Sequence, residues 1–152
     1  MPMNAEETFV AALPHFGLLQ FSGADAQSFL QGQLSCDVAA LAPGQALYGS
    51  YNTPKGRMLA SFLLWRDDAG YTMQLPRSLC EPIGKRLAMY ILRSKVKVRD
   101  ASDDLSVIGV AGANAQAVLQ PLFQAIPAVP LTLTTAQHAS SACNHSSTAI
   151  IS

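Results

Sequence analysis

The sequence predicts a fold class in which strands joined by tight turns combine with helices that have one apolar face. The first observation is the stretch 44–65, where apolar residues stand on both sides of a polar break at residues 52–56. In that break Pro54 fixes its own φ and Gly56 is free to take a positive φ, which is typical of a hairpin turn. The second observation is the stretch 78–92, whose apolar residues recur every three or four positions, as on one face of a helix.

The first elements along the chain are short. Residues 1–12 are expected to form a short helix or a frayed end, and residues 17–22 a first strand. Ser22 and Asp25 then have the spacing of a capping box, which predicts a helix ending at Gly32. Residues 58–65 are almost all hydrophobic, so we expect this arm of the hairpin to be a central strand of a sheet, covered on both faces.

The second half of the chain continues this alternation. Residues 71–75 follow a turn as the third strand of a meander, and the helix over 78–92 tolerates Pro82 in its first turn. Residues 95–99 alternate strictly, which predicts a strand with one buried and one basic face. A further strand is expected over 105–110 and a helix over 115–125. Past Pro127 the residues are mostly Ser, Thr, Ala and His, so we place one domain over 1–126 and a loosely ordered Ser/Thr-rich tail over 127–152.

Composition limits the class of protein. The 152 residues are enough to bury a core. Charged residues make up 13%, about half the usual share, so part of the surface is expected to lie against a partner or another domain. The net charge of zero argues against nucleic-acid binding driven mainly by phosphate contacts. The chain has no apolar run of the roughly 18 residues that a membrane span needs and no basic start followed by an apolar core, so we expect a cytoplasmic protein.

The cysteines do not indicate a disulfide framework or a zinc site. Cys36, Cys80 and Cys143 are far apart and form no Cys-x-x-Cys pair. Cys143 could bind a metal together with His138 and His145, but solvated residues of the tail are the stronger interpretation, and we predict no metal site. Cys80 lies in the first turn of the long predicted helix, a position that can lower the pKa of a thiol.

Basic residues are concentrated in one stretch. Between residues 77 and 99 there are seven of them and a single acid, Glu81. Two interpretations stay open: a solvated face, or a surface that binds a polyanion such as a polyglutamate tail or an RNA backbone. The residues of this predicted basic corner are Lys85, Arg86, Arg93, Lys95, Lys97 and Arg99.

Three ordered blocks carry a resemblance to a known family. They are 30–38 (Leu-Gln-Gly-Gln-Leu-Ser-Cys-Asp-Val), 43–48 (Pro-Gly-Gln-Ala-Leu-Tyr) and 55–58 (Lys-Gly-Arg-Met). They resemble the YgfZ-type folate-binding proteins, relatives of the glycine-cleavage T-protein (aminomethyltransferase), and the resemblance extends over roughly residues 13–123. It implies an α+β fold with a mainly antiparallel sheet, packed helices and a folate cleft beside the hairpin. The chain corresponds to the N-terminal part of that fold.

The resemblance also implies a function. Proteins of this type bind tetrahydrofolate or a derivative and support iron–sulfur enzymes, including those that modify tRNA. The aminomethyltransferases carry an aspartate pair where this chain has Ala60 and Ser61, so we do not expect methylene transfer. The cysteine motif of the YgfZ proteins, Lys-Gly-Cys-aromatic-x-Gly-Gln-Glu, is absent from this sequence. The residues that the resemblance places beside folate are Leu47, Tyr51, Asn52, Ser61 and Arg77.

Alternatives stay open at this point. One is an aminomethyltransferase-like enzyme, which the missing aspartate pair opposes. Another is a truncated interaction domain without a ligand, which the short length and low charge favour. Separately, the chain could be a short paralogue, a truncation or the product of an altered reading frame. The hairpin itself could be a core element only, or its tyrosines could form a wall for a flat ligand. A titration with tetrahydrofolate separates these hypotheses.

Overall fold

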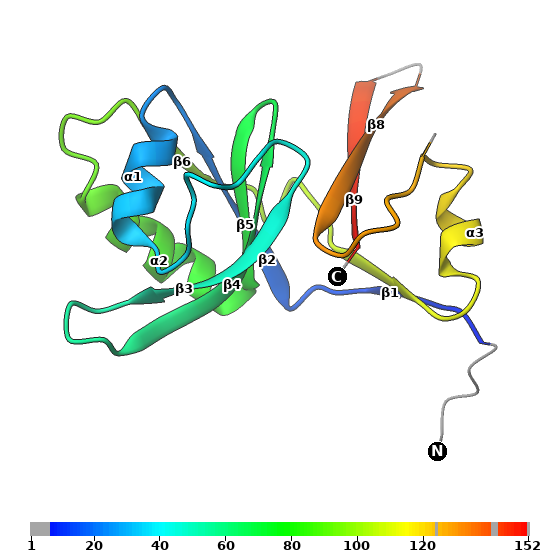
Figure 1. Ribbon diagram of the computed structural model, residues 1–152, viewed down its shortest axis with the longest axis horizontal. Coiled ribbons are helices and arrows are strands. Elements are labelled where there is room, and N and C mark those ends of the chain that lie inside the picture. Colours follow the sequence, from blue (N-terminus) through cyan, green and yellow to red (C-terminus); the bar gives the residue numbers. More distant parts are fainter. Residues whose placement is uncertain (1–6, 124, 141–142, 152) are drawn as a thin grey trace. The chain divides into compact units, whose positions relative to one another are not determined.

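The computed structural model (Figure 1) describes residues 7–123, 125–140 and 143–151. The chain forms two compact units. One unit is Leu13–Val107, and the other comprises the described residues of Met1–Ala12 and Ile108–Ser152. Antiparallel strands and a few helices make up both units, which confirms the predicted α+β class. No helix in the part of the chain that the structure describes is long and apolar enough to cross a membrane.

A five-stranded antiparallel sheet forms the centre of the unit Leu13–Val107. Its order is β3-β4-β5-β2-β6, so the hairpin strand β4 lies inside the sheet, as predicted, and β6 is an edge strand. The strands are β2 (Phe16–Ser22), β3 (Ala46–Asn52), β4 (Met58–Asp67), β5 (Gly70–Pro76) and β6 (Lys97–Asp100).

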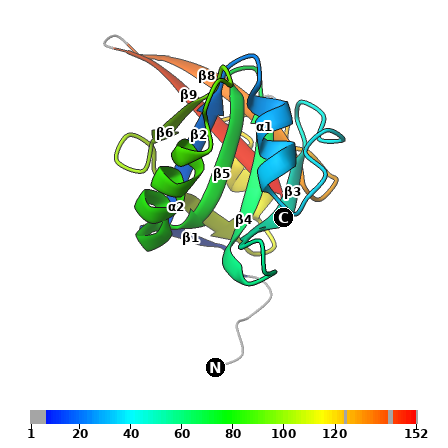
Figure 2. The same ribbon diagram turned by 90° about the vertical axis from the view of Figure 1, so that its left-hand side faces the viewer.

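Two helices, α1 (Ala26–Gln33) and α2 (Arg77–Met89), cover one face of this sheet (Figure 2). Alternate residues of a strand point to the same face, so β2, β4 and β5 each supply a row of side chains to the core beneath the helices. Helix α2 approaches the sheet closely, because a Cβ on Gly84 would lie 3.4 Å from Cδ2 of Leu19. The core includes Leu19, Phe21, Phe62, Leu64, Met73 and Leu75 from the strands, and Phe29, Leu30, Ile83 and Leu87 from the helices.

The hairpin between β3 and β4 closes as the sequence predicted. The N–H of Thr53 donates to the Arg57 carbonyl at 2.8 Å, and the N–H of Gly56 donates to the Thr53 carbonyl at 2.8 Å. Gly56 has a φ of 80°, a conformation that favours glycine. The register between the two strands shifts between Tyr51 and Asn52, because Leu59 is an extra residue that forms a bulge in β4.

The capping box predicted for α1 does not form. Ser22 belongs to β2, and no side chain caps the start of α1. The Asp25 carboxylate instead accepts a hydrogen bond of 2.7 Å from the N–H of Lys95, far along the chain. The helix also runs one residue past Gly32, where the sequence placed its end.

Two prolines act differently from the sequence expectation. Pro82 lies in the second turn of α2, where its ring nitrogen offers no hydrogen to the carbonyl four residues earlier. The helix α3 (Ala115–Leu119) ends two residues before Pro121 rather than continuing to residue 125. A proline inside a helix clashes with the preceding turn, which explains the short α3.

The other unit begins with a strand pair. β1 (Phe9–Ala12) runs antiparallel to β7 (Ile108–Ala111), so the expected helix or frayed end is wrong for residues 9–12, and residues 1–6 lie outside the described ranges. Gly112, with a φ of 120°, follows β7. A Cβ there would lie 2.1 Å from the Glu7 carbonyl oxygen, so this close approach of two backbones requires glycine.

The same unit contains a hairpin of β8 (Thr132–Ser140) and β9 (Cys143–Ile151), where the sequence predicted a loosely ordered tail. Residues such as Thr132, Thr134 and Ile150 are β-branched and favour extended backbone. The hydrogen bonds of an antiparallel ladder form without a periodic apolar face, which is why composition alone was misleading here. The domain boundary at residue 126 stays a prediction.

Candidate functional site

Three of the five residues predicted to contact folate lie toward one end of the five-stranded sheet. Asn52 ends β3 and opposes Met58, the first residue of β4. Because β5 runs antiparallel to β4, β5 ends and α2 begins beside the first half of β4. Asn52, Ser61 and Arg77 therefore belong to the same end of the sheet.

The other two predicted residues, Leu47 and Tyr51, point to the face that packs beneath the helices. Tyr51 is 3% exposed and belongs to the core, and Leu47 packs against that core. Ser61 stands between two core residues of β4, Ala60 and Phe62, so its exposed side chain faces away from the helices. The five residues are therefore divided between the two faces. Tyr51 fits the interpretation of the hairpin as a core element.

Ala60 and Ser61 occupy the place that the resemblance assigns to the aspartate pair. The first is a buried methyl group and the second an exposed hydroxyl. The whole stretch 44–65 contains no Asp or Glu. A cationic, iminium-like centre is stabilised by a carboxylate held beside it, and neither residue provides that charge or exchanges a proton near neutral pH. The hairpin can supply shape and hydrogen bonds to a ligand.

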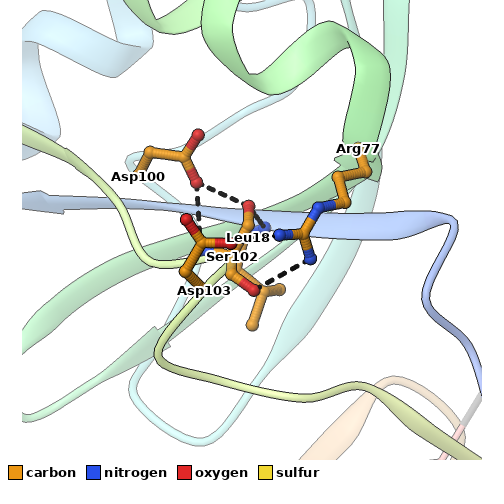
Figure 3. Close-up of polar contacts among 5 residues, drawn as sticks. All are labelled: Leu18, Arg77, Asp100, Ser102 and Asp103. Atoms are coloured by element: carbon orange, nitrogen blue, oxygen red, sulfur yellow. Dashed lines mark hydrogen bonds and ion pairs between the residues drawn. The ribbon is translucent and has the colours of Figure 1, made fainter.

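Arg77 takes part in a hydrogen-bond network beside β2 (Figure 3). Its Nη1 donates to the Ser102 carbonyl at 3.0 Å, and its Nη2 pairs with the Asp103 carboxylate. The Ser102 hydroxyl donates to Oδ1 of Asp100 at 2.5 Å and accepts a hydrogen bond of 3.1 Å from the N–H of Leu18. Arg77 thus holds the segment after β6 against β2, while its side chain remains 44% exposed.

Sequence reasoning missed the Asp100 carboxylate and the Ser102 hydroxyl, which lie at the centre of this network. The N–H of Ser102 donates to Oδ1 of Asp100 at 2.9 Å, which makes the pair an Asx turn. An aspartate at the end of a strand, two residues before a serine, was the only local signal for it. The contact of Ser102 with Leu18 spans 84 residues and has no such signal.

The packing beneath the network is tight. A Cβ on Gly17 would lie 2.4 Å from Sγ of Cys80 and 2.6 Å from Oγ of Ser102. Burial raises the pKa of the Cys80 thiol, and the negative charge of Asp100 raises it further. The hydrogen bond with Ser102 and the positive charge of Arg77 lower this pKa, but burial is the largest cause. The lowering that the first turn of a helix can cause is therefore outweighed at Cys80.

Cys36 is half-buried against the hairpin, since a Cβ on Gly49 would lie 2.8 Å from its Sγ. Burial raises its pKa as well; a backbone hydrogen bond lowers it and the neighbouring Asp37 raises it further. Both thiols are thus protonated near neutral pH, and a protonated thiol is a poor nucleophile and metal ligand. Neither is a candidate catalytic group.

The metal candidates of the sequence lie in the terminal hairpin. His138 belongs to β8, and Cys143 and His145 belong to β9; their side chains are outside what the structure describes. Elsewhere within the described residues, no group of three His, Cys, Asp or Glu side chains is placed to hold a metal ion.

The sheet divides the predicted basic corner. Lys97 and Arg99 alternate with Val96 and Val98, which pack against the core, so both cations face away from the helices. Arg99 also donates to Gln20 on the neighbouring strand at 2.9 Å. It pairs in addition with the carboxylate of residue 104.

The remaining cations lie elsewhere. Lys85 and Arg86 are on α2, on the helix side of the sheet, and Lys85 pairs with Glu81 at 2.5 Å. Arg93 and Lys95 are in the connection between α2 and β6. The six residues therefore do not form one continuous surface, because alternation in a strand and periodicity in a helix direct them to opposite sides.

The chain matches a protein family along most of its length. The GCVT N-terminal domain matches residues 6–146. Similar curated proteins include the tRNA-modifying protein YgfZ of Klebsiella pneumoniae (strain 342), 38% identical over 115 residues, and that of Escherichia coli (strain K12 / DH10B), 35% identical over 115 residues. Each alignment covers 76% of this chain and 35% of the relative. The chain thus spans about a third of the length of these relatives.

A solved structure shares the fold. The glycine cleavage system aminomethyltransferase T from Bartonella henselae matches with a TM-score of 0.66 at 19% sequence identity, over 77% of this chain and 32% of that chain. This likeness concerns the fold alone, and it confirms the α+β architecture that the resemblance implied. The domain match over most of the chain shows that the chain belongs to the GCVT family, in which its similar relatives are YgfZ proteins.

Proposed function

We propose that this chain is a folate-binding protein of the YgfZ type, which acts in the cytoplasm in support of iron–sulfur enzymes and tRNA modification. The observation that carries the proposal is the similarity to YgfZ proteins, 38% and 35% identical over 76% of the chain. Those relatives are named tRNA-modifying proteins. The ligand would be tetrahydrofolate or a derivative.

The end of the sheet where β3 ends and β4 begins offers suitable groups for such a ligand. Asn52, Ser61 and Arg77 bring an amide, a hydroxyl and a guanidinium to this end. The ring of Tyr48 is 63% exposed and lies on the same face as Ser61, since both alternate with core residues. A pterin ring combines a flat aromatic surface with donors and acceptors in its plane, which these side chains can stack on and hydrogen-bond.

Binding to this chain alone should be weak, because Leu47 and Tyr51 are committed to the core. We expect a dissociation constant on the order of millimolar to tens of micromolar, equivalent to roughly 4 to 6 kcal/mol. Isothermal titration calorimetry and amide chemical shifts with tetrahydrofolate, on this chain and on a version extended to the length of the relatives, measure it. Hairpin shifts that stay unmoved at saturating ligand in both versions would refute folate binding.

Matched variants test the location. Ser61→Ala and Tyr48→Ala should weaken binding, since each removes a group from the proposed face. Ser106→Ala removes an exposed hydroxyl outside the hairpin and should leave binding unchanged. Equal effects of Ser61→Ala and Ser106→Ala would place the ligand elsewhere.

Folate binding without methylene transfer is the expected activity. A positioned carboxylate contributes about 10²-fold or more to such a step, and Ala60 and Ser61 provide none. Measurable tetrahydrofolate-dependent turnover of an aminomethylated carrier protein would favour the aminomethyltransferase alternative. If both versions of the chain show no binding and no turnover, the ligand-free interaction domain is favoured.

A polyanion contact is the second part of the proposal, limited to the side of the sheet away from the helices. The triple change Lys95→Glu, Lys97→Glu, Arg99→Glu should weaken binding of pentaglutamyl folate or tRNA and flatten its salt dependence, since screening acts over about 10 Å at 0.1 M salt. The double change Lys85→Glu, Arg86→Glu reverses the charges on the helix side for comparison, and it should have the smaller effect on tRNA binding. Unchanged binding by the triple variant at low salt would identify a solvated face.

A further inference from the structure

A hollow of about 480 Å³ lies between the first residues of β4 and helix α2. Five apolar side chains line it, among them Leu59, Ile83 and Met89, together with two cations, Lys85 and Arg86. All of these residues belong to the unit Leu13–Val107. The volume lies within the roughly 300–1,000 Å³ of small-molecule sites.

Arg86 gives this hollow its polar character. Its Nε is buried and has no hydrogen-bond partner among the described residues. A buried donor without an acceptor is unfavourable, so the arrangement favours an acceptor that comes from outside the chain. Lys85 precedes it, with an ammonium group that is exposed and paired with Glu81.

Two exposed methionines belong to the elements that border the hollow. Met89 is 67% exposed and Met58, at the start of β4, is 61% exposed. Methionine side chains are flexible and polarisable, and they adapt to apolar ligands of different shape. The side chains that line the hollow include two cations and no acid, so its charge is complementary to an anion.

We propose that this hollow binds a small amphipathic anion, with an apolar chain on the lining of β4 and α2 and a carboxylate at Arg86. Burial of the chain against Leu59, Ile83 and Met89 provides the apolar contribution. The guanidinium can offer Nε and one Nη side by side to the two oxygens of a carboxylate. This site lies on the helix side of the sheet, whereas Ser61 faces the other side, so the inference does not rest on folate binding.

Decanoate is the probe for this chemistry. Titration of the isotope-labelled chain should shift the amides of residues 59 and 79–89. Decanol has nearly the same chain without the charge, and it should bind at least about tenfold more weakly, because the charge-assisted contact with Arg86 is lost. Acetate, which has the charge without the chain, should leave these amides unmoved.

Variants separate the two contributions. Arg86→Met keeps an apolar stem, so it should weaken the binding of decanoate about tenfold and leave the binding of decanol unchanged. The affinity of Arg86→Lys for decanoate should be intermediate. Met89→Ser, at an exposed position, should weaken decanoate and decanol alike. Arg93→Met removes an exposed cation outside the hollow and is the control. If Arg86→Met does not fold, Lys85→Met and Met89→Ser still test the charge and the apolar lining.

Several outcomes would overturn the proposal. Equal affinity for decanoate and decanol would remove the role of the charge. Amides of the lining that stay unmoved up to the solubility limit of decanoate would remove the site, and an equal loss with Arg93→Met would make the effect nonspecific. A fourth arm uses vesicles of phosphatidylglycerol. Binding to those vesicles without binding of free decanoate would identify a membrane surface instead of a small ligand.

Discussion

The two ends of α2 carry arginines in opposite situations. Arg77, the first residue of the helix, donates to the Ser102 carbonyl and pairs with Asp103, so it connects the helix to the segment after β6. Arg86, near the other end, borders an apolar hollow, and its Nε has no hydrogen-bond partner within the described part of the chain. In the sequence both are one positive charge in the same basic stretch. An arginine whose donors meet acceptors of the chain supports the fold, whereas one with a donor left over remains open to a ligand.

The largest effect that follows from this comparison concerns the packing under Arg77. Gly17→Ala places a methyl group 2.4 Å from Sγ of Cys80, so we expect a loss of about 3 kcal/mol in the free energy of unfolding, the upper part of the range for overpacking. Urea unfolding measures it. Gly32→Ala is the matched control, because a Cβ there meets nothing within 4 Å, and in a helix it should stabilise by about 0.5–1 kcal/mol. Equal midpoints for the two variants would show that the Gly17 contact is relaxed.

The next effect concerns the hydroxyl at the centre of the network. Ser102→Ala leaves the N–H of Leu18 and the carboxylate of Asp100 without this partner, so we expect a loss of about 2 kcal/mol. Ser61→Ala removes an exposed hydroxyl and should change stability by less than about 0.5 kcal/mol. Urea midpoints of the two variants compare them directly. A Ser102→Ala chain as stable as Ser61→Ala would mean that water replaces the hydroxyl.

The parts of the fold that the sequence predicted well depend on local signals. The hairpin follows from a polar break with Pro54 and Gly56 between apolar runs, and β4 follows from its continuous hydrophobe. The long helix follows from an apolar stripe in which Ile83 and Leu87 are indeed buried. In each case neighbouring residues alone determine the preferred backbone, so no distant partner had to be known.

The candidate site was harder to predict because it depends on strand faces and distant partners. The pairing of β3 with β4 determines which of Tyr51 and Ser61 faces the core, and the sequence of one strand does not specify that pairing. The Asp25 carboxylate has the spacing of a cap, yet it accepts from the N–H of Lys95, 70 residues away. Lys97 follows Arg86 by only eleven positions, but one belongs to a strand face and the other to a helix face.

A direct comparison of the two arginines should give a smaller effect. Arg77→Met should cost about 1 kcal/mol, because its ion pair with the exposed Asp103 is screened while the Ser102 carbonyl loses a donor. Arg86→Met removes a donor that has no partner among the described residues and keeps the apolar stem, so stability should stay within about 0.5 kcal/mol of the original chain or rise. Urea unfolding at low and high salt measures both. If Arg86→Met is the more damaging change, Arg86 has a structural partner and the contrast between the two ends of α2 fails.

The smallest expected effect is a pH dependence at the Arg77 end of the helix. Burial raises the pKa of the Cys80 thiol above its ordinary value of 9.0, so the folded chain holds this proton more tightly than the unfolded chain does. The stability that the neutral thiol provides is fully present below pH 9.0 and is lost as the pH rises through the folded pKa. The free energy of unfolding of the reduced chain should therefore fall more steeply above pH 9.0 than that of Cys80→Ala, which lacks this titration. Cys36→Ala should reduce the slope as well, because burial also raises the pKa of the Cys36 thiol. Parallel curves for the original chain and Cys80→Ala would show that the folded state binds the Cys80 proton no more tightly than the unfolded state.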